Sequence, residues 1–200
     1  MEFSAAEREQ IAGELRSALA RSGLTQDAFA HLIGTSRSRL SAYLNARTMP
    51  SAALYQRILR TAAGLASARR HGWMTPDRTA EEVDEALRSG DEDWAFKLVV
   101  QARDQLRAML ERNDPASDAW LLRSRPISDP RYDALLAALI QHEFDQSDHP
   151  LRPEWAEDPH LETTWTQTNL RRGEEWTRMH TPDWLARRGI FIADRDLMTA

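Results

Sequence analysis

The chain has 200 residues, no cysteine, and ordinary proportions of hydrophobic (42%) and charged (28%) residues. This composition indicates one or two small globular domains with a hydrophobic core, and it excludes disulfide frameworks, thiolate zinc sites and cysteine nucleophiles. No apolar run reaches the roughly 18–20 residues of a membrane span, and the first residues lack the apolar segment of a secretory signal, so we expect a cytoplasmic protein.

The formal net charge of −5 conceals two parts of opposite sign. Residues 1–70 carry a balance of +5, whereas residues 71–200 carry −10. A basic segment suits a polyanionic partner such as DNA, and an acidic segment does not. The charge distribution therefore predicts two parts with separate functions.

Along the first 65 residues, short apolar stripes at helical spacing alternate with clear boundary signals. The predicted helix starts are Ser4 (a capping box with Glu7), Thr25, Ser36 and Ser51, and the breaks between them fall at Gly23, Gly34 and Pro50. This part of the chain is therefore predicted to be a bundle of short helices.

The segment 71–79 is predicted to be a linker because it contains Gly72 and Pro76. Beyond it, residues that can cap a helix precede stretches of helical apolar spacing at Thr79, Asp91 and Asp129. From Gln146 onward prolines break the chain and the apolar residues lose their periodicity. Irregular structure with short strands and one brief helix starting at Thr181-Pro182 is expected there.

These patterns predict a mainly α-helical protein with two domains. Residues 1–70 are expected to form one helical domain. Residues 80–200 are expected to form a second, mostly helical domain whose end is irregular and rich in proline and tryptophan.

Residues 24–45 have the spacing of a helix-turn-helix motif. Phe29 and Ile33 supply the buried face of a first helix, Gly34 tolerates the positive φ of a tight turn, and Leu40 docks a second helix. Ala30 is small where the two helices approach each other. In this geometry the second helix can enter a DNA major groove while the first crosses the backbone.

The same stretch resembles the Xre family, the lambda-repressor-like helix-turn-helix domains. Residues 24–36 follow the family pattern except at Thr35, where an aliphatic residue is usual, and Ala46 stands where the family often has glycine. The resemblance covers residues 8–65. It implies an N-terminal lambda-repressor-like helical bundle that binds a double-stranded DNA operator, with palindromic half-sites if the protein is a homodimer.

The resemblance assigns DNA contacts to eight residues. Ser36 caps the recognition helix, whose N-terminal amides suit phosphate. Arg37, Ser38 and Arg39 form its first exposed turn and are expected to reach base edges, where arginine can bind guanine O6 and N7. The remaining contacts are Gln26 (phosphate or support of a base contact), Ala42 (a thymine methyl), and Asn45 and Arg47 (backbone). The alternative is that these side chains are only solvated polar groups on a helical hairpin.

The strongest candidate for a metal or catalytic cluster is the segment 142–149, which holds two histidines and three carboxylates. Its spacing differs from the His-Glu-x-x-His pattern that places two histidines on one helix face, and it lies where a helix ends before Pro150. The pair His180 and Asp183 belongs to an ordinary Thr-Pro-Asp helix start. We therefore expect no catalysis, no metal and no cofactor.

All seven tryptophans lie outside the helix-turn-helix. Trp94 is predicted to be a core residue on the apolar face of its helix. Four others are predicted to mark a protein contact surface, because tryptophan is enriched at interface hot spots; they are Trp155, Trp165, Trp176 and Trp184. The alternative is a dimerisation domain with every tryptophan in its core.

The segments 152–155 and 181–192 also resemble actinobacterial Xre-type proteins that are encoded beside nucleotidyltransferase-like proteins, in pairs similar to toxin–antitoxin modules. This resemblance implies an autoregulating antitoxin that binds its toxin through residues beyond about 80. A stand-alone dimeric repressor is the alternative, and an enzyme fused to a DNA-binding module is the third hypothesis.

Overall fold

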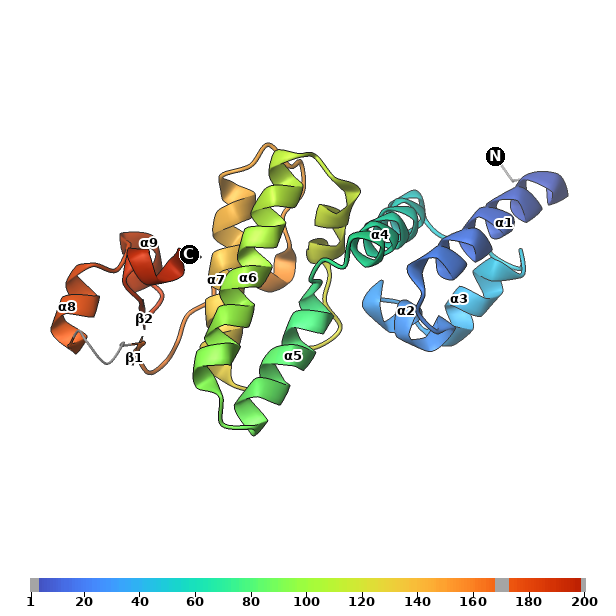
Figure 1. The fold of residues 1–200 in the computed structure, drawn as a ribbon. Helices are drawn as coiled ribbons and strands as arrows, with labels where there is room; N and C mark the ends of the chain where they lie inside the picture. Colours follow the sequence, from blue (N-terminus) through green and yellow to red (C-terminus); the bar gives the residue numbers. More distant parts are fainter. Residues whose placement is uncertain (1–3, 168–172, 199–200) are drawn as a thin grey trace. The chain divides into compact units, whose positions relative to one another are not determined.

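The computed structural model describes residues 4–167 and 173–198, and these are mainly helical, as predicted (Figure 1). The chain divides into two compact units. Unit 1 consists of the described residues up to 76 together with 113–124, and unit 2 consists of the other described residues. In the described part of the chain, none of the helices combines the length and apolarity needed to cross a bilayer.

Unit 1 contains α1 (Ala5–Ser22), α2 (Gln26–Leu32), α3 (Arg37–Leu44), α4 (Ala52–His71) and the 3-10 helix η1 (Pro115–Leu121). All of the helix starts predicted for this unit are confirmed. The side-chain oxygens of Ser4, Thr25, Ser36 and Ser51 each accept a hydrogen bond of 3.2 Å from the backbone amide three residues later. Each cap satisfies one of the amides that a helix start leaves without a partner.

The core of unit 1 is the apolar cluster that the helical spacing predicts. Phe29, Ile33 and Leu40 of the helix-turn-helix are fully buried. Leu15 of α1 and Ile58 of α4 belong to the same buried cluster. The two short helices therefore share one apolar core with the two longer ones.

Residues 113–124 return to unit 1 and pack η1 against α4. Gly64 makes this approach possible, because a Cβ atom at this position would lie only 2.6 Å from the backbone nitrogen of Ala119. Trp120 of η1 is fully buried, and Asp114 accepts a hydrogen bond of 2.8 Å from the Ser67 hydroxyl of α4. The sequence-based domain boundaries differ here, because they place this segment in the second domain.

Unit 2 begins with three longer helices, α5 (Pro76–Arg88), α6 (Glu92–Glu111) and α7 (Pro130–Asp145). Figure 1 shows α6 and α7 packed side by side. The predicted caps Asp91 and Asp129 are confirmed. The start predicted at Thr79 is wrong, because α5 already begins at Pro76. Proline is tolerated at this first helical position because the amide there would have no intrahelical acceptor. The predicted linker is therefore reduced to the short connection between α4 and α5.

The end of unit 2 consists of short elements, as the loss of periodicity predicts. They are η2 (Glu154–Ala156), β1 (Trp165–Thr166), α8 (Glu174–Met179), α9 (Asp183–Ala186), β2 (Ile190–Phe191) and η3 (Asp194–Leu197). The strands β1 and β2 pair in parallel, with Trp165 opposite Ile190 and Thr166 opposite Phe191.

A buried carboxylate joins α6 and α7. Glu143 is 5% exposed and accepts hydrogen bonds of 2.9 and 2.7 Å from the guanidinium of Arg107. Arg103 lies 3.9 Å from the same carboxylate and also donates a hydrogen bond to the carbonyl of Leu197. These contacts fix the last described turn of the chain to α6.

The prediction that Trp94 belongs to the core is wrong, because this side chain is 49% exposed in the first turn of α6. Helical periodicity places Trp94 on the same face as Leu98, which is buried. Helical periodicity shows which residues share a face of α6. It does not show at which turns a neighbouring element covers that face.

The contact at Gly64 predicts opposite effects for two helical glycine-to-alanine substitutions. Gly64→Ala should lower the free energy of unfolding by about 1–3 kcal/mol, because η1 must move away from α4. The matched control, Gly13→Ala in α1, should raise it by about 0.5–1 kcal/mol, since its Cβ would approach no atom closer than 3.7 Å. Urea denaturation of both variants measures the difference. Equal effects would contradict the proposed packing role of Gly64.

Candidate nucleic-acid interface

The turn between α2 and α3 has the closed geometry that the motif requires. Gly34 adopts a left-handed φ of 76°. The amide of Thr35 donates a hydrogen bond of 2.9 Å to the carbonyl of Ala30. The amide of Gly34 donates one of 3.1 Å to the carbonyl of His31. This turn directs α3 away from α2 immediately after the end of α2.

The N-terminus of α3 is suited to an anionic partner. The Ser36 hydroxyl caps the amide of Arg39 and lies 3.1 Å from the Ser38 hydroxyl. The first turn contains no acidic residue that would offset the positive end of the helix dipole. Arg37 and Arg39 are both exposed in this turn. A DNA phosphate or base edge would therefore meet amides, hydroxyls and two cations.

Gln26 connects the starts of the two helices. Its side-chain amide donates a hydrogen bond of 3.3 Å to the carbonyl of Arg37. Together with Ser36, Ser38 and Ser41 these residues line one shallow hollow on the surface. Four of the predicted DNA-contacting residues are thus brought together, and the position of Gln26 fits a role in supporting a base contact.

Ser41 is the lining residue that sequence reasoning missed. It is half-buried and lies one helical turn after Arg37 and Ser38, on the same side of α3. The sequence signal that could have found Ser41 is its spacing, four residues after Arg37 and three after Ser38, which places all three on one side of a helix.

The other predicted contacts lie at the far end of α3. Ala42 is half-buried, while Asn45 and Arg47 are exposed. The side-chain amide of Asn45 donates to the carbonyl of Ser41 (2.8 Å), so it closes the helix. The structure therefore gives Asn45 a capping role in addition to the predicted backbone contact.

Two arginines, one from α1 and one from α4, bond to the C-terminal ends of the motif helices. Arg16 of α1 donates a hydrogen bond of 2.6 Å to the carbonyl of Leu44, the last residue of α3. Arg57 of α4 donates one of 3.3 Å to the carbonyl of Ile33, which ends α2. Both bonds satisfy carbonyls that a helix end leaves without intrahelical donors, and they orient the predicted DNA-binding face.

The comparison with known families agrees with this geometry. Residues 15–61 match the family model described as a helix-turn-helix, HTH_3. This stretch is therefore an Xre/lambda-repressor-like helix-turn-helix domain, and it supports a DNA-binding transcriptional regulator. No curated protein and no solved structure matches the chain.

The four tryptophans predicted to form a contact surface have different environments. Trp165 is 9% exposed and packs 5.2 Å from the ring of Tyr132, so it is a core residue of unit 2. Trp155, Trp176 and Trp184 are half-buried. Trp176 stacks on His180 with ring centroids 4.0 Å apart.

The histidine and carboxylate cluster at 142–149 does not assemble into a metal site in the structure. Across residues 4–167 and 173–198, no group of three or more such side chains has a geometry that could hold a metal ion. His149 instead bonds the backbone of Leu151, at 3.0 Å from its carbonyl.

The backbone at Ala46 generates a stability prediction. Ala46 has a φ of 56°, in the left-handed region that costs alanine about 1 kcal/mol and glycine almost nothing. Ala46→Gly should therefore raise the free energy of unfolding by about 0.5–1 kcal/mol. Ala53→Gly, in the exposed first turn of α4, should lower it by a similar amount. Thermal melts of both variants check the sign, and destabilisation by both would contradict the expectation.

Proposed function

We propose that the protein is a sequence-specific transcriptional repressor that places α3 in the DNA major groove. The observation that carries this proposal is the pair of exposed arginines in the first turn of a capped helix that lacks acidic residues. As a homodimer it binds a palindromic operator in the cytoplasm, with half-sites about 34 Å apart. The basic balance of residues 1–70 supports the phosphate contacts of such a complex.

We further propose that the repressor is the antitoxin of a toxin–antitoxin pair and regulates its own transcription. Unit 2 would then bind the toxin, a nucleotidyltransferase-like protein, through a surface that includes Trp155, Trp176 and Trp184. The acidic balance of residues 71–200 disfavours a second DNA site and suits a basic protein partner. No catalytic role is assigned to unit 2.

A stand-alone dimeric repressor is the second candidate, and the burial of Trp165 favours it. A core tryptophan in the irregular end indicates that this region packs on α7 within unit 2 rather than serving only as a docking segment. In this alternative, unit 2 is a dimerisation domain and no toxin binds.

The DNA-binding proposal is tested on the DNA upstream of the protein's own gene. Arg37→Ala and Arg39→Ala should each weaken specific binding by about 1–3 kcal/mol, because each removes a guanidinium that can read a base edge. Titrations on this DNA and on a scrambled duplex at fixed salt measure the specificity ratio. Arg88→Ala removes an equal charge from the exposed end of α5 in unit 2 and should leave the ratio unchanged. An unchanged ratio in both α3 variants would remove these arginines from base recognition.

The partner proposal is tested by co-expression with the protein encoded next to it. Trp176→Ala should reduce partner binding by about 2 kcal/mol or more with little loss of stability, as at an interface hot spot. Trp165→Ala, the matched control in the core, should instead cost about 3–5 kcal/mol of folding free energy. Calorimetric binding and thermal melts separate the two effects. If Trp155, Trp176 and Trp184 all behave like Trp165 and no protein co-purifies, the stand-alone repressor is supported.

A further inference from the structure

Unit 2 contains a pocket that shares Trp184 with the proposed partner surface and otherwise lies outside it. It lies between the C-terminal half of α7, the segment 158–160 and the end of α9, with a volume of about 650 Å³. This volume is within the range of small-molecule sites. The lining includes His142, Asp145, Asp158, Trp184, Arg187 and Arg188.

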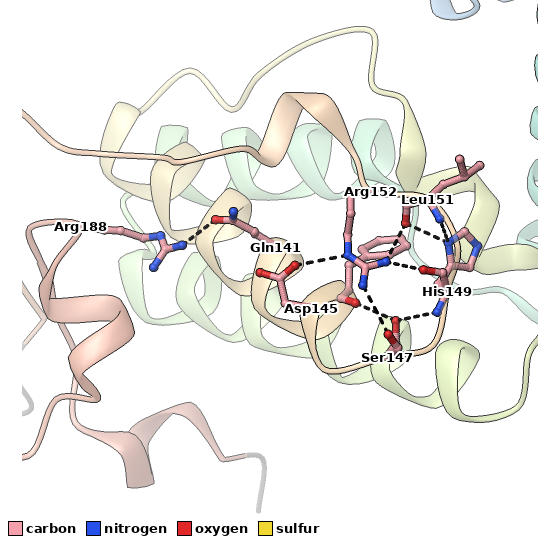
Figure 2. A network of polar contacts seen from close by, with 8 residues as sticks. Gln141, Asp145, Ser147, His149, Leu151, Arg152 and Arg188 are labelled. Atoms are coloured by element: carbon pink, nitrogen blue, oxygen red, sulfur yellow. Dashed lines mark hydrogen bonds and ion pairs between the residues drawn. The ribbon is translucent and has the colours of Figure 1, made fainter.

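The pocket walls are held by specific contacts between α7 and the segment around α9. The rings of His142 and Trp184 stack almost parallel, with centroids 4.1 Å apart and an interplanar angle of 6°. Arg188 donates a hydrogen bond of 2.6 Å to the side-chain oxygen of Gln141, and Figure 2 shows it reaching across to α7. The site is therefore preformed, which reduces the cost of ordering it around a ligand.

The lining holds two arginines and two carboxylates, but one of these carboxylates is paired with an arginine outside the lining. Asp145 is already paired with Arg152, at 3.3 Å (Figure 2). Among the described residues, the guanidinium of Arg188 bonds only neutral acceptors, the side chain of Gln141 and the carbonyl of Trp184. Its Nε–H is buried and has no acceptor among the described residues.

Arg187 adds a second cation to the same wall. Its Nε donates to the carbonyl of Asp183 at 3.3 Å, and within the described ranges it makes no ion pair. Arg187 and Arg188 thus line a pocket in which Asp158 is the one lining carboxylate without an ion pair in the described part of the chain, so the two cations exceed the unpaired carboxylates. An anion would offset this excess, because guanidinium groups bind carboxylate and phosphate oxygens in a bidentate manner.

His142 fits an anion site as a neutral partner. Burial lowers the pKa of His142, and the positive charges of Arg107 and Arg188 lower it further, while Glu143 and Asp145 act in the opposite direction. The imidazole is therefore mainly neutral near pH 7. An anion bound beside Arg188 would stabilise the protonated ring and raise this pKa.

We propose that this pocket binds a small anionic ligand whose carboxylate or phosphate lies against Arg187 and Arg188. The stacked pair of His142 and Trp184 forms the adjacent wall. A bound anion also offsets the charge of the partly buried Arg188. Ligand binding should therefore raise the stability of the folded unit 2.

The test uses the full chain and two minimal probes, inorganic phosphate and citrate, in separate titrations at constant ionic strength set with NaCl. Binding is followed by NMR at the indole N–H of Trp184 and at the ring of His142, assigned with Trp184→Phe and His142→Gln. At least one probe should cause saturable shifts and a rise in the pKa of His142. Saturation by phosphate alone identifies a phosphate ligand, and saturation by citrate alone identifies a carboxylate ligand.

A pair of arginine variants distinguishes a site from general screening. Arg187→Gln should weaken the apparent affinity about tenfold or more, because it removes a charged donor. Arg195→Gln is the matched control, since this exposed arginine of unit 2 does not line the pocket. Shifts that do not saturate with either probe, or that are equal in the two variants, would overturn the proposal and indicate an adventitious ion only.

Discussion

Helices α2 and α3 contain seven and eight residues, which is too short for a stable helix in water. The DNA-binding motif therefore depends on the apolar core that it shares with α1 and α4. Burial of Phe29, Ile33 and Leu40 supplies the driving force. The arginines from α1 and α4 then fix the ends of the two short helices. With the apolar residues of α2 and α3 buried in this core, Arg37 and Arg39 are left exposed on the predicted DNA-binding face.

Lysine occurs only at Lys97, so arginine supplies nearly all of the basic side chains. These arginines have three distinct physical roles. Arg16 donates to the carbonyl of Leu44 at the end of α3, and Arg107 compensates the buried carboxylate of Glu143. Arg37 and Arg187 instead place charge on a surface or in a pocket without a carboxylate partner among the described residues. Composition cannot distinguish these roles, because the same planar fork serves all of them. The distinction comes from what lies within hydrogen-bond distance.

The two units differ in how much of them local sequence signals could predict. In unit 1 the caps at Thr25 and Ser36 and the turn at Gly34 act over three to five residues, and all were predicted correctly. In unit 2, the exposure of Trp94 and the burial of Trp165 depend on elements far along the chain. Tryptophan is compatible with a core and with an interface, so residue type alone left both alternatives open.

The sequence by itself determined the four helix starts at Ser4, Thr25, Ser36 and Ser51, the helix-turn-helix and its polar face, because caps, turns and amphipathic periodicity are local properties of the chain. It also determined the division of charge between the two parts. Only the tertiary structure decided that residues 113–124 pack on α4 at Gly64, and that His142 and Arg188 come together in one pocket. The physical reason is that these contacts join residues about 45 to 55 positions apart, where loop closure permits many pairings and only packing of the complete fold selects one.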